Sequence, residues 1–126
     1  MKEVGDGHKN FVINWEYYLG YDSLDSIKIK YKHDDGKLLS YALKKKGNHV
    51  QLNRNDANDR DNQNLIIEAD DISVARITLK NVLFKFDHNT KFICTIITVS
   101  GNLITSEVTL IVYGIYYLIL FYLFIL

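Results

Sequence analysis

The fold of this chain is decided by one stretch of strict alternation, Ser26-Ile27-Lys28-Ile29-Lys30-Tyr31-Lys32. Ile27, Ile29 and Tyr31 are apolar, and a lysine follows each of them. Successive side chains of a β-strand point to opposite faces of the sheet. The stretch therefore predicts a strand with one face in the core and the other in water.

The same period-2 pattern recurs, less strictly, from residue 11 to residue 113. We expect strands at residues 11–18, 26–32, 37–43, 49–52, 65–68, 74–82, 92–99 and 107–112. Asp35-Gly36 and Gly101-Asn102 are typical of tight turns between strands, and the polar stretch 53–64 reads as a solvated loop. The sequence predicts an all-β protein of two packed antiparallel sheets with little helix.

Length and charge limit the possible classes. A chain of 126 residues suits one domain with its own core. Its 15 basic and 15 acidic residues cancel, so no overall field favours nucleic acid as a partner. Cys94 is the single cysteine, so an intrachain disulfide is excluded.

Nothing in the sequence predicts an enzyme or a cofactor. Cys94 alternates with Phe92 and Ile96, which points its thiol into the core, where a cysteine is inert. No small-molecule substrate is expected. No pair of histidines has the spacing of metal ligands; the four lie at His8, His33, His49 and His88.

One polar stretch partly matches the spacing of a calcium-binding loop. Asp59, Asp61 and Gln63 alternate as in an EF-hand, with Asp70 at the twelfth position. Asn64 stands where that loop needs glycine, and Asp70 is shorter than the bidentate glutamate. We expect no metal here.

The C-terminal part is strongly apolar. No charged residue occurs from Thr109 onward, and residues 114–126 are predicted as a hydrophobic tail that is a partial or truncated transmembrane segment. Residues 1–10 are polar and contain no secretory signal. We expect a single-pass membrane protein whose domain lies outside the cell.

A family resemblance rests on the run Arg76-Ile77-Thr78-Leu79-Lys80-Asn81-Val82, followed by Asp87-His88-Asn89-Thr90-Lys91-Phe92-Ile93-Cys94. It resembles strand E and the corner before strand F of a V-type immunoglobulin domain. The resemblance implies an immunoglobulin-like sandwich over residues 11–113, with strand B at 11–18, strand C at 26–32 and strand G at 106–112.

The chain departs from that family at three positions. Trp15 stands in place of the strand B cysteine, Ile29 in place of the strand C tryptophan, and Phe92 in place of the corner tyrosine. Trp15, Ile29 and Cys94 would then form a hydrophobic pin in place of a disulfide. Two alternatives stay open: Trp15 is itself the strand C tryptophan, or the fold is another β-sandwich or meander.

The resemblance implies a recognition or adhesion module that binds another protein, either a second copy or a different one. The alternative is an incomplete fragment of a larger membrane protein. The predicted binding face combines outward lysines with β-branched and aromatic residues; it consists of Lys28, Lys30, Lys32, Ile93, Thr95, Ile97, Val99, Ile111 and Tyr113.

Overall fold

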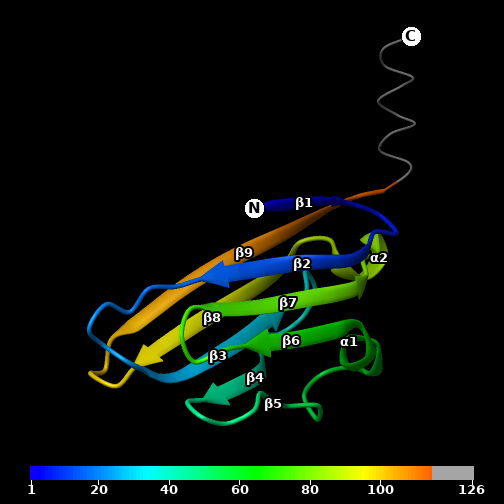
Figure 1. The fold of residues 1–126 in the computed structure, drawn as a ribbon. Coiled ribbons are helices and arrows are strands. Elements are labelled where there is room, and N and C mark those ends of the chain that lie inside the picture. The colour runs from blue at the N-terminus through cyan, green and yellow to red at the C-terminus, as the bar shows by residue number, and fades with distance from the viewer. Residues whose placement is uncertain (115–126) are drawn as a thin grey trace.

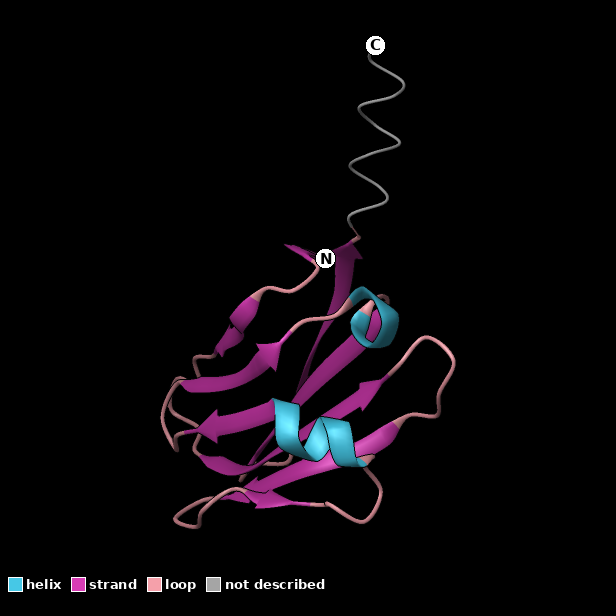
Figure 2. Cartoon of the chain, turned by 90° about the vertical axis from the view of Figure 1, so that its right-hand side faces the viewer, coloured by secondary structure: helices cyan, strands magenta, loops and turns pink. Residues whose placement is uncertain are grey.

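The computed structural model describes residues 1–114 and folds them into two β-sheets (Figures 1 and 2). The larger sheet has the order β1-β9-β8-β3-β4-β5. Its strands are β1 (Lys2–Gly5), β9 (Leu103–Tyr113), β8 (Thr90–Thr98), β3 (Leu24–Lys32), β4 (Leu39–Lys45) and β5 (Gln51–Leu52). The smaller sheet has the order β2-β7-β6. Its strands are β2 (Lys9–Glu16), β7 (Val74–Asn81) and β6 (Leu65–Ala69).

Neighbouring strands are antiparallel except at one edge. β1 pairs with β9 in parallel, from Lys2 opposite Leu110 to Gly5 opposite Tyr113. Two short helices, α1 (Asp59–Asn64) and α2 (Phe84–Asp87), complete the elements. The prediction of a mostly β protein with two sheets is confirmed.

The core lies between the sheets and is built by alternation. Ile27, Ile29 and Tyr31 of β3 are each at most 2% exposed, whereas Lys28 and Lys32 are exposed. Inward residues of β2 and β7 meet them from the smaller sheet, because both strands follow the same period. The alternating stretch 26–32 thus lies in β3, one of the two central strands of the larger sheet.

Trp15 and Cys94 lie on opposite sheets. Trp15 is on β2, opposite Ala75 of β7. Cys94 is on β8, where Ile29 of β3 is its direct neighbour. The sequence left two positions open for Trp15, on the strand next to that of Cys94 or on the opposing sheet. The structure places it on the opposing sheet.

Part of the predicted solvated loop is helical. The side chain of Asn58 accepts a hydrogen bond from the N–H of Asp61 at 2.7 Å, which caps the start of α1. Asp61 and Asn64 are buried. The loop prediction was wrong at 59–64. Local polarity does not reveal that Asp61 has a hydrogen-bond partner, His33, in a distant part of the chain.

The two ends of the chain also differ from the sequence prediction. The polar segment 1–10 contains β1, whose Val4 is 6% exposed. β9 begins four residues before the predicted strand. No helix in residues 1–114 is long and apolar enough to cross a membrane. The transmembrane prediction is corrected to that extent, and residues 115–126 of the predicted tail lie outside the described residues.

Candidate protein-binding site

β2 is an edge strand along its whole length. Among residues 1–114, it pairs only with β7. The hydrogen bond from Tyr17 N–H to Ser73 O, at 2.8 Å, shows which backbone groups face β7. Since these groups alternate along an antiparallel strand, Asn14 and Glu16 direct their N–H and C=O away from the sheet.

β9 is an edge strand over its first seven residues. β1 lies beside it from Leu110 onward, so within the part of the chain that the structure describes, residues 103–109 are paired with β8 alone. The bond from Thr98 N–H to Asn102 O, at 3.0 Å, sets the alternation. By that alternation Leu103, Thr105 and Glu107 present their backbone N–H and C=O to the open side.

A cavity of about 270 Å³ opens between these two edges. Figure 1 shows β2 and β9 running along the same side of the sandwich. Trp15 and Cys94 lie at its inner end, and Ile104 is 41% exposed at its mouth. The cavity is lined by Asn14, Trp15, Glu16, Tyr17, Cys94, Ile96, Ile104 and Ser106.

Trp15 brings an unsatisfied donor to this cavity. Its side chain is almost fully buried, at 7% exposure, and its Nε1–H has no hydrogen-bond partner among the described residues. A buried indole N–H usually finds an acceptor. Within residues 1–114, the open side therefore has no further strand paired to its two edges and no acceptor for the indole N–H of Trp15.

Two further polar groups that line the cavity, Cys94 and Tyr17, are held in their protonated forms. Burial raises the pKa of the Cys94 thiol to about 12, so the thiolate is scarce at neutral pH. Burial, with the nearby Asp70 and Asp71, raises the pKa of Tyr17 to about 12. The Tyr17 hydroxyl donates to the backbone oxygen of Asp70 at 3.0 Å.

The predicted binding face is one surface in its centre. Lys28 lies opposite Thr95, and Lys30 lies opposite Ile93. Ile97 lies along the same outer row of β8, and all three β8 residues are half-buried.

The remaining predicted residues lie away from that centre. Val99 is 64% exposed and follows the end of β8. Ile111 and Tyr113 lie beside β1 at the far end of β9. Binding through this face stays a prediction.

A second hollow, of about 330 Å³, lies beside α1 and α2. His33 and Asp61, which line it, belong to a row of three hydrogen-bonded polar side chains. Thr90 Oγ1 lies 2.8 Å from His33 Nδ1, and His33 Nε2 lies 2.7 Å from Asp61 Oδ2. Burial alone would raise the pKa of Asp61, but the hydrogen bond and charge of His33 outweigh it and lower that pKa.

A hydroxyl, an imidazole and a carboxylate in line can make a nucleophile. Here Thr90 is 0% exposed, so its hydroxyl cannot reach a substrate. The chain of contacts ties β8, β3 and α1 together.

An ion pair between Arg60 and Asp87 also connects α1 to α2. Arg60 of α1 donates to both carboxylate oxygens of Asp87, at 2.8 and 2.7 Å, and Asp87 also accepts from Leu83 N–H at 2.8 Å. Arg60 further lies over the Phe86 ring, 4.7 Å from its centre. Asp61 thus has a structural role. Among the described residues, no group of three or more His, Cys, Asp or Glu side chains could hold a metal.

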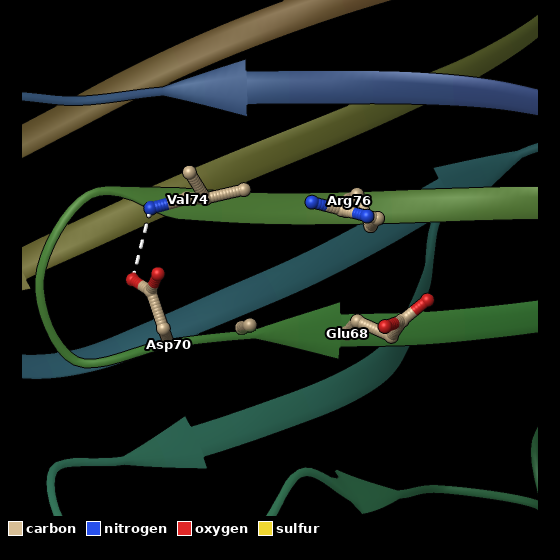
Figure 3. Close-up of a pocket in the computed structure, with 5 residues that line it drawn as sticks. Glu68, Asp70, Val74 and Arg76 are labelled. Atoms are coloured by element: carbon tan, nitrogen blue, oxygen red, sulfur yellow. Dashed lines mark hydrogen bonds between the residues drawn. The ribbon is translucent and has the colours of Figure 1, made fainter.

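A third hollow, of about 250 Å³, lies at the β6–β7 hairpin (Figure 3). Asp70 closes this turn by accepting from Ile72, Ser73 and Val74 N–H at 2.7–3.0 Å. These bonds, first that of Ser73, lower the pKa of Asp70. The carboxylate is occupied by the turn, so this hollow has a structural explanation.

Sequence reasoning missed the open side. The prediction began the last strand at residue 107, so Leu103 and Ile104 were not recognised as an edge. The available signal was the apolar pair directly after the Gly101-Asn102 turn. What could not be read is that, within residues 1–114, β1 lies beside β9 only from Leu110 onward.

Comparison with known proteins supplies a fold and no family. No family model and no curated protein matches the sequence. Among solved structures, the chain is similar to a chain of "Structural basis of T cell specificity and activation by the bacterial superantigen toxic shock syndrome toxin-1". The TM-score is 0.63 at 10% identity, over 89% of this chain and 92% of that chain. At this identity the likeness shows the fold alone.

This comparison corrects the family prediction. It returns a structure concerned with a bacterial superantigen, and no family model supports membership of the V-type immunoglobulin family. The adhesion function, with its fragment alternative, is corrected too, and so is the transmembrane helix, as far as residues 1–114 show. The location at a membrane, with the domain outside the cell, stays a prediction. The resemblance rested on the runs 76–82 and 87–94, but their buried residues, such as Ile77, Leu79 and Cys94, are core positions that any two-sheet β fold can fill with apolar residues. The prediction of a non-enzymatic chain agrees with the comparison.

Proposed function

We propose that the chain is a non-catalytic domain that binds another protein through the open side between β2 and β9. The observation that carries the proposal is the cavity of about 270 Å³ bordered by two unpaired strand edges. Exposed apolar groups beside unpaired backbone are features of protein contacts. Leu103 and Ile104, at 67% and 41% exposure, provide both.

The similar structure supports a protein partner as a class. Its description concerns T cell specificity and activation by a superantigen, which are matters of protein recognition. The identity of that partner does not transfer at 10% identity. The proposal for this chain is limited to a protein and to this side of the domain.

The finer description of the fold, an immunoglobulin-like sandwich, is proposed for architecture alone and apart from family membership. Strand order supports it. β8 and β3 are central in the larger sheet, β9 lies next to β8, and β2-β7-β6 form the opposing sheet. This is how strands are distributed in sandwiches of that type.

Site-specific crosslinking tests the proposed function. A photo-crosslinking residue is placed at Ile104 in the full chain, and a matched one at Leu38, which is 51% exposed in the β3–β4 connection. In cells that make the chain, a discrete protein adduct is expected from position 104 and not from 38. Leu103→Lys should remove the adduct, and Leu38→Lys should not. Equal adducts from both positions would refute the proposal.

A further inference from the structure

We infer that the partner enters this open side as an extended segment and adds a strand to the free edge of β9 at residues 103–109. The inference rests on the proposed function and specifies how the partner binds. A segment added to a sheet edge gains affinity from its main chain and specificity from alternate side chains.

The edge of β9 is poorly protected against such addition. Natural edge strands carry lysines, prolines or inward charges that prevent pairing. Residues 103–106 read Leu-Ile-Thr-Ser, and Glu107 is the single charge of residues 103–109. The edge of β2, by contrast, carries two charged residues, Lys9 and Glu16. We therefore assign the added strand to β9.

The added strand has a place prepared in the sheet. β1 already lies beside β9 at residues 110–113, with Lys2 opposite Leu110. The positions next to residues 103–109 continue the same row. A strand there would complete the larger sheet along the full length of β9.

The cavity defines the side chains of the segment. By alternation, every second residue of the added strand points between the sheets, toward Trp15 and Ile104. An apolar side chain fits there, and an oxygen of the segment can accept from Trp15 Nε1–H. A basic residue suits the position near Glu107. The ligand is thus an extended, alternating apolar segment with one lysine or arginine.

A second copy of this chain is a poorer occupant. In a second copy, the inward side chains of β9, Ile104 and Ser106, belong to that copy's own cavity. The β9 edges of two copies could pair with each other, but these side chains could not fill the cavity of the first copy. A single segment can do both.

A synthetic peptide tests the inference on the full chain. The probe alternates valine and threonine and ends in lysine, and binding is followed by the emission of Trp15, the single tryptophan. Two further peptides carry N-methyl groups, each on one of the two alternate sets of amides. Only one set faces β9, so one N-methylated peptide should bind about ten-fold or more weakly while the other retains affinity.

Hydrogen exchange locates the bound strand. The amides of Thr105 and Glu107 should become protected when the peptide binds, and those of Asn14 and Glu16 should not. No binding, equal affinity of the two N-methylated peptides, or protection confined to β2 would overturn the inference. Self-association that the peptide leaves unchanged would overturn it in favour of a second copy.

The two proposals fail differently. If a partner crosslinks at Ile104 but leaves the amides of Thr105 and Glu107 unprotected, the domain binds protein on this side without strand addition. If the crosslinking also fails, the proposed function is wrong as well.

Discussion

Trp15 and Cys94 line one cavity from opposite sheets, Trp15 from β2 and Cys94 from β8. No covalent bond joins the sheets here, because Cys94 is the single cysteine. The sheets are held at this point by apolar packing, and the packing is incomplete.

Trp15→Ala should destabilise the domain by about 3–5 kcal/mol, the usual cost of truncating a large buried aromatic side chain. Chemical denaturation measures the change. Tyr18→Ala is the control, since Tyr18 is 89% exposed, and it should cost little. A Trp15→Ala cost below about 1 kcal/mol would show that the indole contributes no core packing.

Cys94 should be unreactive in the folded chain. With its pKa raised to about 12 from 9.0 by burial, the thiolate population at pH 8 falls about a thousandfold relative to the ordinary thiol. A chromogenic thiol reagent should therefore react slowly with the native chain and rapidly in guanidinium chloride. Equal rates in both conditions would place the thiol at the surface.

Asp61 should make stability depend on acid pH. Its pKa is lower in the folded chain than in the unfolded one, so its contribution is present above the unfolded value, about 4, and is lost as pH falls through the folded value. Asp61→Asn should cost about 1–3 kcal/mol at pH 7 and flatten the acid limb of the stability curve. The exposed Asp34→Asn is the control, and an unchanged acid limb in Asp61→Asn would contradict the assignment.

The Arg60–Asp87 pair should require arginine. Arg60→Ala leaves the carboxylate of Asp87, which is 2% exposed, without its bidentate partner, and should cost about 3 kcal/mol. Arg60→Lys should recover only part of this, because an ammonium group cannot donate along two parallel bonds. Full recovery in thermal unfolding would show that charge alone matters.

Substitutions on β8 test its register. Ile96→Asp should unfold the domain, because Ile96 is 4% exposed and points inward. Ile93→Asp should cost about 1 kcal/mol or less, since Ile93 faces outward opposite Lys30. The reverse order of the two costs would mean that the strand is shifted by one residue.

The sequence predicted what alternation controls. Ile27, Ile29 and Tyr31 are buried and their lysine neighbours point to solvent, because period 2 is a property of the strand itself. The position of α1 and the burial of Asp61 depend on His33, which lies 28 residues away. Such partnerships carry no local pattern.

The candidate site was beyond sequence reasoning for a related reason. An open edge is defined by the neighbour that is missing, and alternation says nothing about neighbours. Leu103 has the same local character as a covered strand residue. In the part of the chain that the structure describes, Leu103 is an edge residue because β1 lies beside β9 from Leu110 onward and not before it.

The pairing of β1 with β9 also sets an order for synthesis. Lys2 and Leu110 are partners in one ladder, and β8 must lie between β9 and β3 before that ladder can form. On a ribosome, the N-terminal strand emerges first but has nothing to pair with until the last strand has left the exit tunnel. The β1–β9 ladder therefore forms only after β9 has emerged, and until then the edge of β8 that β9 covers stays open to other partners.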